Sequence, residues 1–492
     1  MNMKPIITIA FVLPLLSGTL VAEQSYLLHS TRTEGEVDRV QVLLEVGGQM
    51  TATSGGKQHK SKLNVVCDLA YHEKTLEAVA KQKSPEEDED SAPDTRSVRY
   101  YDKAEAAVRT ENAELKPKLR VKRRLVVAEL NSDGSVLFSP EGPLSRAELE
   151  LIDVQGNTML LDRLLPGQSV SVGDKWQLSD DLLATLLGPD TVAESDVYCT
   201  LTEVTDEVAR MEIGGKLQGT CDGAATKMEI KGKYRFDRRM KRIDWFALLV
   251  KESRQSNALT NGLEVIARVQ VRVKPGAACE ELSAASLEDI SLDAGPASRL
   301  LKYEPSDESW QCAHDRRWIV TGESPNITAM RMVDHGDVLA RCGISPLPKG
   351  KPEEIVSLEE FQADIERGLG ESFGEFVSAG VRMNSENYRV YRVVVSGQAR
   401  AMVEVADKKD GKTKAEEQTV PIQWRYYLVA ERGGRRLVFV FSMEEALADR
   451  FGGEDLKLVD SLVFAEAGQG SEDDETAETS EKITEKRNGT NR

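Results

Sequence analysis

The feature that most constrains the fold is the alternation of apolar and polar residues through the first half of the chain. Because successive side chains of a strand point to opposite faces, this pattern predicts strands with one buried and one solvated face. Short polar connections such as TDE and DGAA join the runs, as expected for antiparallel hairpins. We therefore expect residues 23–276 to form a β-rich antiparallel domain. The clearest runs are DVYCTLTEV, VARMEIGGKLQGT, TKMEIKGKYRF and DWFALLVKES, between residues 196 and 253.

Two helices are expected to interrupt these strands. SRAELELI begins with Ser145 and has Glu148 three residues later, which is the pattern of a capping box. SDDLLATLLGP begins with Ser179 and ends at Gly188 and Pro189, which are typical start and stop residues of a helix. Both helices lie between an early and a late group of strands.

These two groups of strands share a short pattern. EVGGQMTATSGG (45–56) matches EIGGKLQGTCDG (212–223), and LNVVCDLAYHEK (63–74) has the same alternation as MEIKGKYRFDRR (228–239). One interpretation is a duplicated β-meander. The other is coincidence, because Gly-Gly between alternating strands recurs in many β proteins. The sequence leaves both interpretations open.

The N-terminus has the pattern of a secretory signal. Lys4 supplies a positive charge, an apolar run extends from Ile6 to Leu16, and small residues end at Ala22. The segment is too short for a membrane span, so residues 1–22 are predicted to be a cleaved signal peptide. No later run of about 18 apolar residues follows, so we expect no integral membrane segment after cleavage. The mature chain is expected to be soluble, and periplasmic or secreted.

Three polar segments divide the rest of the chain. SPEEDEDSAPD, residues 84–94, is too charged to pack and is predicted to be a mobile loop within the first domain. Residues 277–306 lack a strong period and are predicted to be an interdomain linker with one helical turn. Residues 467–492 are acidic and poor in apolar residues, so we expect a disordered tail.

The charge balance argues against one class of partner. The chain has 82 acidic and 64 basic residues and a net charge of −18, whereas non-specific nucleic-acid binding needs a basic face. The sequence contains no H-E-x-x-H, G-x-S-x-G or Walker motif. We therefore predict no nucleic-acid partner, no cofactor and no catalytic residue.

The second half of the chain predicts strands and helices together. SLEEFQADIERGL has Ser357 and Glu360 as a capping box, and its apolar residues fall on one helical face. Three or four strands follow, among them YRVYRVVVSGQA and IQWRYYLVAE, then a tight RGGRR turn and LVFVFS. This order predicts an α+β domain over residues 307–466, with helices covering an antiparallel sheet.

The segment WRYYLVAERGGRRLVFVFSMEEALADRFGGEDLKLVDSLVF (424–464) resembles the end of a PsbP/Mog-type domain, and HDRRWIV (314–320) resembles that family's short strand, bend and Trp. The resemblance covers residues 309–465 and implies an α/β sandwich with a binding or assembly role. More loosely, the first domain resembles the LolA/LppX-type exported carriers. That likeness implies a curved sheet whose concave face holds a lipid or lipoprotein.

Cysteine and histidine gather in one short stretch, at Cys312, His314, His335 and Cys342. Zinc sites usually take two ligands from a tight knuckle, which the C-x-H and H-x₆-C spacing does not supply, so no metal ligand is predicted. A Cys312–Cys342 disulfide suits an exported chain, but it requires the chain to bend between His314 and Trp318. HDRR permits that bend. Unpaired thiols are the alternative.

One basic cluster is a candidate surface site. KPKLRVKRRLVV is predicted to be a strand that places Lys118, Arg120, Lys122 and Arg124 on one face, with Leu119, Val121 and Leu125 on the other. A second basic set occurs in KYRFDRRMKR (233–242). Such runs are usually solvated sheet faces. The functional interpretation is a patch for anionic lipid, polysaccharide or an acidic partner.

Together these patterns predict an exported, non-enzymatic binding or assembly protein of the bacterial cell envelope, with an unknown protein or lipid partner. One alternative is a lipid or lipoprotein carrier that uses the first sheet. The other is a hydrolase or metal-dependent enzyme that uses the cysteine and histidine segment.

Overall fold

A computed structural model describes most of the chain and shows a β-rich protein, with 57% of the residues that it describes in strands and 16% in helices. The predicted signal peptide, acidic loop 84–94 and tail 467–492 lie outside the described residues. Among the residues described, no helix is long and apolar enough to cross a membrane. The described ranges are 24–54, 57–77, 95–131, 134–221, 223–256, 260–334, 337–351, 356–406 and 413–465.

The first half of the chain forms one thirteen-stranded antiparallel sheet, as its alternation predicts. Strand β14 shows the pattern clearly, because Met228, Ile230 and Tyr234 are buried while Lys231 and Lys233 are exposed. The strands are β2 (Val37–Ser54), β3 (Lys57–Glu77), β4 (Thr95–Arg109), β5 (Glu114–Leu115), β6 (Leu125–Asn131), β7 (Gly134–Phe138), β10 (Lys175–Gln177), β11 (Thr191–Ser195), β12 (Tyr198–Val204), β13 (Val208–Cys221), β14 (Ala224–Asp237), β15 (Arg242–Arg254) and β16 (Gly262–Pro275).

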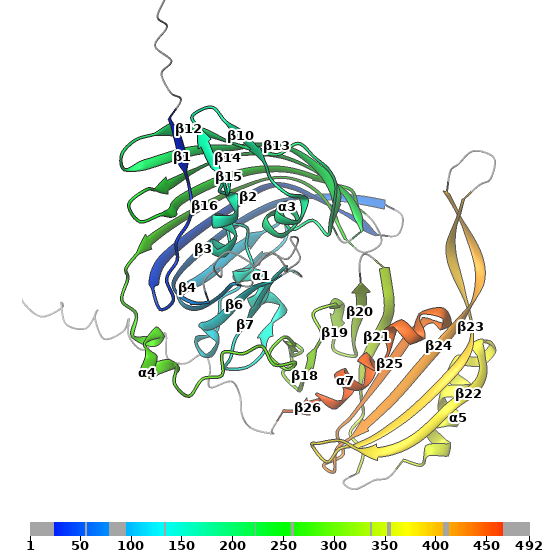
Figure 1. The fold of residues 1–492 in the computed structure, drawn as a ribbon. Coiled ribbons are helices and arrows are strands. Elements are labelled where there is room, and N and C mark those ends of the chain that lie inside the picture. Colours follow the sequence, from blue (N-terminus) through cyan, green and yellow to red (C-terminus); the bar gives the residue numbers. More distant parts are fainter. Residues whose placement is uncertain are drawn as a thin grey trace, which may run out of the picture.

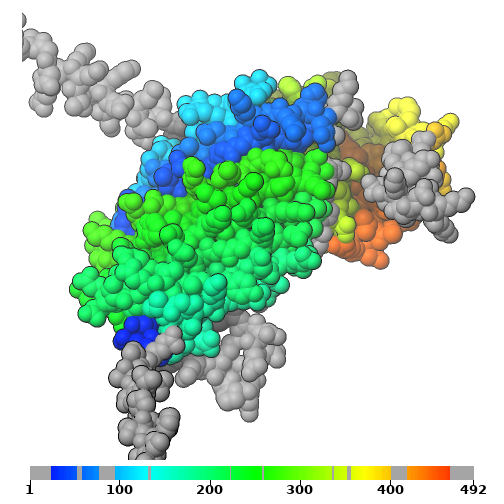
Figure 2. Space-filling model, turned by 90° about the horizontal axis from the view of Figure 1, so that it is seen from above, coloured from blue at the N-terminus to red at the C-terminus, as the bar shows by residue number. Residues whose placement is uncertain are grey.

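The early and late groups of strands join in the middle of this sheet. Strand β16 pairs with β2 from Gly262 opposite Thr51 to Pro275 opposite Asp38. In the space-filling view the blue N-terminal strands lie directly against the green strands of the later group (Figure 2). The two predicted meanders therefore form one continuous surface.

The two hairpins that share the Gly-Gly pattern have the same backbone requirement. A Cβ atom on Gly48 would lie 2.2 Å from the carbonyl oxygen of Glu264, and one on Gly215 would lie 2.4 Å from that of Asp196. Gly48 pairs with Leu63, and Gly215 pairs with Ile230. Measured from these pairings, the two following strands match with a shift of two residues, which preserves the alternation that they share. The close approach explains the shared glycines under either interpretation of the similarity.

The sheet curves around its own helices (Figure 1). The capping box of Ser145 and Glu148 is present, and the third helix ends at Gly188 in the left-handed conformation, as predicted. The helices pack with the inner side chains of the sheet in one hydrophobic core. The helices are α1 (Arg146–Ile152), α2 (Thr158–Leu161) and α3 (Asp180–Leu187). The other short elements of this half are the strands β1 (Ser25–Leu27), β8 (Leu144–Ser145) and β9 (Ser169–Ser171) and the 3₁₀ turns η1 (Val121–Arg123) and η2 (Asp162–Leu164).

A buried carboxylate ties α2 to this sheet. Glu73 on β3 is 1% exposed and accepts hydrogen bonds from Arg99 Nε at 2.8 Å and Thr158 Oγ1 at 2.5 Å. Arg32 donates to Asp162 at 2.6 Å and to the Thr158 carbonyl at 3.0 Å. Burial alone would raise the pKa of Glu73, but the charges of Arg99 and Arg32 outweigh it and lower that pKa to about 2.

Residues 277–306 include the expected helical turn but also pack against the first domain, which the prediction of a polar linker missed. Leu282 is 1% exposed in a cluster with Val98, Val127 and Phe138. Lys74 Nζ also donates to the Leu282 carbonyl at 2.9 Å. The segment therefore covers the outer face of β4, β6 and β7. Its elements are η3 (Glu280–Leu282), α4 (Ala284–Leu287) and β17 (Leu301–Tyr303).

The second half of the chain forms a seven-stranded antiparallel sheet with helices on both faces. Helix α5 (Leu358–Leu369) has the predicted Ser357 capping box and packs Phe361 and Ile365 on one face. Helices α6 (Ala448–Phe451) and α7 (Glu454–Asp460) pack on the other. The strands are β19 (Trp318–Ser324), β20 (Ile327–Asp334), β21 (Asp337–Leu347), β22 (Phe373–Met383), β23 (Arg389–Ala406), β24 (Thr413–Ala430) and β25 (Arg436–Glu444), with 3₁₀ turns η4 (Gly370–Ser372) and η5 (Glu445–Leu447).

This sheet has a buried carboxylate of its own. Asp455 on α7 is fully buried and accepts hydrogen bonds from Arg425 Nη1 at 3.0 Å and from the Tyr427 hydroxyl. Arg425 also donates to the Gly452 carbonyl at 2.7 Å. The network fixes the last helix to β24.

A small sheet joins the two halves. Strand β8 of the first half pairs in parallel with β17. Strand β17 also pairs with β18 (Trp310–His314), and β18 pairs with β26 (Val463–Phe464) at the end of the second half. The chain turns after β18, since β18 and β19 belong to different sheets. In this turn the Trp318 N–H donates to the Asp315 carbonyl at 3.0 Å. The bend that HDRR permits is therefore present.

Candidate functional site

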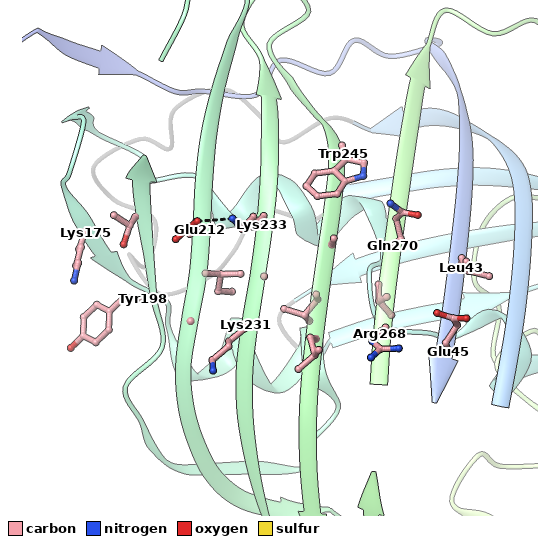
Figure 3. Close-up of a pocket in the computed structure, with 18 residues that line it drawn as sticks. Leu43, Glu45, Lys175, Tyr198, Glu212, Lys231, Lys233, Trp245, Arg268 and Gln270 are labelled. Atoms are coloured by element: carbon pink, nitrogen blue, oxygen red, sulfur yellow. Dashed lines mark ion pairs between the residues drawn. The ribbon is translucent and has the colours of Figure 1, made fainter. Parts of the chain in front are cut away.

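The outer face of the first sheet, opposite helices α1–α3, has a hollow of about 830 Å³ (Figure 3). It extends across seven strands, from β10 and β12 through β13–β16 to β2. Its lining combines aromatic, apolar and charged side chains. The lining side chains that project from this face are Leu43, Glu45, Lys175, Tyr198, Thr200, Glu212, Lys231, Lys233, Trp245, Ala247, Leu249, Arg268 and Gln270.

An apolar strip lies along the centre of this hollow. Trp245, Ala247 and Leu249 occupy successive outward positions of β15 and are half-buried. Strand pairing places Lys233 and Gln270 on either side of Ala247. The register therefore sets polar side chains on both flanks of the strip, with neighbouring strands about 4.8 Å apart.

The next row of the sheet repeats this arrangement with two cations. Leu249 lies between Lys231 on β14 and Arg268 on β16. On the far side of Lys231 the row continues to Gly214, which has no side chain, and then to Tyr198. The absent side chain at Gly214 leaves the floor open between the Tyr198 ring and the Lys231 ammonium group.

The lysines of the hollow are weakly held. Lys233 pairs with Glu212 at 2.9 Å and Lys231 with Glu229 at 3.2 Å, but all four side chains are at least 43% exposed. Such exposed pairs contribute little to stability, so a ligand anion can compete for these lysines. Arg268 and Lys175 form no ion pair with any other described residue. The hollow can therefore bind negative charge without disrupting a buried contact.

The opposite, concave face does not offer the surface that the LolA/LppX resemblance implies. Its side chains, among them Met211, Phe246 and Val271, are fully buried in the core that includes Leu160 and Leu183 of the helices. The protein's own helical layer therefore occupies this face. We place the candidate site on the outer face instead.

The predicted basic strand at Lys118, Arg120, Lys122 and Arg124 is wrong. The chain forms the 3₁₀ turn η1 there, Val121 is 68% exposed, and β6 begins only at Leu125. Arg120 binds the carboxylate of Glu148, the capping residue of α1, and donates to it from Nε and Nη2 at 2.6 Å each. The four side chains therefore do not share one strand face.

Arg120 and Lys118 line a second cavity, a cleft of about 940 Å³ between the two halves of the protein, together with His314 and Trp318. Arg146 crosses the cleft and donates to the Trp318 carbonyl at 3.1 Å and to the Arg316 carbonyl. Arg316 in turn donates to the Leu137 carbonyl at 2.5 Å. These directional bonds make the cleft a joint between the domains.

The residues of the cysteine and histidine segment lie in two places: the two cysteines are in a hydrophobic core, and His314 lines this cleft. Cys312 and Cys342 are buried in one hydrophobic cluster and are free thiols in the structure. Burial raises the pKa of Cys312 to about 12, and that of Cys342 well above its usual range, so both are protonated at neutral pH. The disulfide between them stays a prediction.

His314 is also buried, and its Nδ1 lies 2.8 Å from the Asp315 carbonyl. Desolvation lowers its pKa, which favours the neutral ring. His335 lies outside the described residues. Within the part of the chain that is described, no three His, Cys, Asp or Glu side chains gather as metal ligands.

The sequence patterns indicate one residue of the hollow and miss the rest. The second basic set begins at Lys233, but Lys231, Trp245 and Arg268 were not singled out. Each is an ordinary outward residue of its own strand. Their common feature appears only once the strands are placed in register, and alternation within one strand does not supply that register.

Comparisons with known proteins do not identify the chain. No family model and no curated protein matches it. A crystal structure from Bacteroides thetaiotaomicron matches 35% of this chain and 50% of that one, with 10% identity and a TM-score of 0.21. Two further structures each match 84% of this chain. The match covers 89% of the NalP translocator domain from Neisseria meningitidis and 98% of OccK2 (OpdF) from Pseudomonas aeruginosa. Their identities are 9% and 10%, with TM-scores of 0.09 and 0.12. Scores this low support no assignment of fold or function.

Proposed function

We propose that the protein is an exported, non-enzymatic binding or assembly protein of the bacterial cell envelope, and that it holds a negatively charged ligand in the outer-face hollow. The observation that carries the proposal is the apolar strip of Trp245, Ala247 and Leu249, with Lys231 and Arg268 on its flanks. Ligand sites commonly combine an apolar floor with a few convergent polar groups.

The charge of the whole protein sets a condition that the hollow meets. A net charge of −18 repels anions at long range, so an anion can bind only where cations are concentrated locally. The hollow supplies Lys175, Lys231, Lys233 and Arg268 against the two carboxylates Glu45 and Glu212. A binding role also agrees with the PsbP/Mog-type resemblance of the second domain.

The hydrolase alternative has less support from the candidate nucleophiles. Catalysis by cysteine requires a thiolate that the substrate can reach. Cys312 and Cys342 are each 2% exposed, with raised pKa values. We therefore favour binding over hydrolysis by this segment.

The proposal is tested with the mature chain and fluorescent dextran sulfate, a polyanion built on sugar rings, followed by anisotropy at several salt concentrations. Lys231→Glu combined with Arg268→Glu should weaken binding at least about tenfold, since both flanks of the strip become repulsive. Lys349→Glu combined with Arg367→Glu changes the net charge equally at exposed sites of the second domain and should leave binding nearly unchanged. Equal losses in the two double variants, or no binding by the unmodified chain, would refute the proposal.

A further inference from the structure

We propose that the ligand of the outer-face hollow is an acidic polysaccharide, laid diagonally from Tyr198 to Trp245 across Lys231 and Lys233. This inference rests on the proposed function, because it specifies the chemistry of the anion that the same hollow binds. It follows from the spacing of the two rings, the position of the lysines and the presence of carboxylates among them.

The two aromatic side chains mark the ends of an extended path. Tyr198 lies on β12 and Trp245 on β15, three strands away, which is about 14 Å across the sheet. Tyr198 shares a row with Leu249, and Trp245 lies four residues along β15 from Leu249, about 13 Å further. The diagonal is therefore about 20 Å long, which suits a chain of several sugar rings rather than one small anion.

The rings are placed to stack on sugars. Tyr198 is 42% exposed and Trp245 is half-buried, and Figure 3 shows Lys231 and Lys233 between the two rings. An aromatic face binds the apolar face of a pyranose ring and keeps a polar edge available for hydrogen bonding. Thr200, Glu212 and Gln270 in the same hollow can bond to hydroxyl groups.

The carboxylates in the hollow favour spaced rather than dense negative charge. Glu212 lies beside Lys233, and Glu45 lies opposite Arg268. A ligand with several anions on every unit would meet both carboxylates and bind less tightly than one with a single anion on each unit. A polysaccharide with acidic groups on separate rings can direct its charges to the lysines and its hydroxyls to the carboxylates.

The hollow also distinguishes a polymer from an anionic membrane. Its floor is formed at Gly214, Ala247 and Leu249, between the longer side chains of Lys231, Arg268 and Tyr198. A flat bilayer surface would contact the longer side chains but not the floor. A single chain can lie along it.

The experiment compares four probes on the mature chain by calorimetry: galacturonic acid, oligogalacturonates of increasing length, poly-glutamate of matched charge, and phosphatidylglycerol vesicles. We expect affinity to rise with oligogalacturonate length until the diagonal is filled, and poly-glutamate to bind at least about tenfold more weakly, since it cannot stack on the rings. Trp245→Ala should weaken oligogalacturonate binding about tenfold, while Trp245→Phe restores most of the loss and Lys349→Glu combined with Arg367→Glu leaves oligogalacturonate binding nearly unchanged. Circular dichroism and thermal melting confirm that the variants are folded.

The outcomes separate the two proposals. If poly-glutamate binds as tightly as oligogalacturonate, the hollow is a general anion site, so the proposed function stands and the polysaccharide is overturned. Binding to vesicles that depends on Lys231 and Arg268, without oligogalacturonate binding, assigns the hollow to a membrane surface and also overturns it. If dextran sulfate fails together with every other probe, the proposed function fails as well.

Discussion

The two large sheets of the molecule use their faces differently. In the second, β25 buries Phe439 and Phe441 against the side of α7, while Val438 and Val440 pack on the side of α5. In the first, β14 buries one face only and presents Lys231 and other charged residues on the opposite one. Their sequences differ accordingly, with continuous apolar runs where both faces are covered and alternation where one face is open.

This difference separates stability from binding. Residues of a sheet covered on both sides are constrained by packing, so nearly every substitution there disturbs a core. An open face can vary its outward residues without affecting the core beneath, and it can therefore carry recognition. The following predictions test that separation, beginning with the largest expected effect.

The strongest test removes the buried carboxylate of each domain. Glu73→Gln and Asp455→Asn should each lower the free energy of unfolding by about 3–5 kcal/mol, because each leaves buried arginine charge without its partner. Hydrogen exchange read by mass spectrometry should localise each loss to its own domain. A change below about 1 kcal/mol would show that the network is not needed to hold the helix.

Removing matched aromatic residues compares the two kinds of face directly. Phe441→Ala opens a cavity in the covered sheet and should cost about 3–5 kcal/mol. Trp245→Ala removes a half-buried ring from the open face and should cost less than half as much. Chemical denaturation of both variants provides the comparison, and equal losses would mean that the outer face is packed rather than open.

Acid should affect the first domain through Glu73. Its pKa in the folded chain is lowered from 4.5 to about 2, so its ionised form stabilises the fold above pH 4.5 and that contribution is lost as the pH falls toward 2. The shift corresponds to about 3 kcal/mol. Glu73→Gln should flatten the pH dependence of the melting temperature in this window, whereas the Trp245→Ala control should retain it.

The smallest expected effect is on the stability of the open face itself. Lys231→Ala and Lys233→Ala should each change the free energy of unfolding by no more than about 0.5 kcal/mol, because their ion pairs are exposed. The same variants should weaken dextran sulfate binding. Loss of stability together with loss of binding would contradict the separation of the two faces.

Features that depend on local chemistry could be predicted from the sequence. The capping boxes at Ser145 and Ser357 and the helix end at Gly188 involve residues within a few positions of one another, and all three are confirmed. The antiparallel strands of the first domain followed from alternation for the same reason.

Features that depend on distant partners could not. Arg120 leaves its predicted strand because Glu148 attracts it, and Leu282 becomes buried because Val98 and Phe138 offer an apolar surface. The hollow depends on the register of seven strands, including the register that sets Arg268 of β16 opposite Glu45 of β2. No periodicity within a single segment contains that information.

The pairing of β16 with β2 has a consequence for the order of folding. Asp38 meets Pro275, so the first sheet can close only after its last strand has been made and released. Pairing between segments this far apart in sequence slows folding. Until β16 has been made, the edge of β2 that it pairs with stays open. The early group of strands therefore keeps this edge open until the late group has been made, so the pairing of β2 with β16 is the step that completes the first domain.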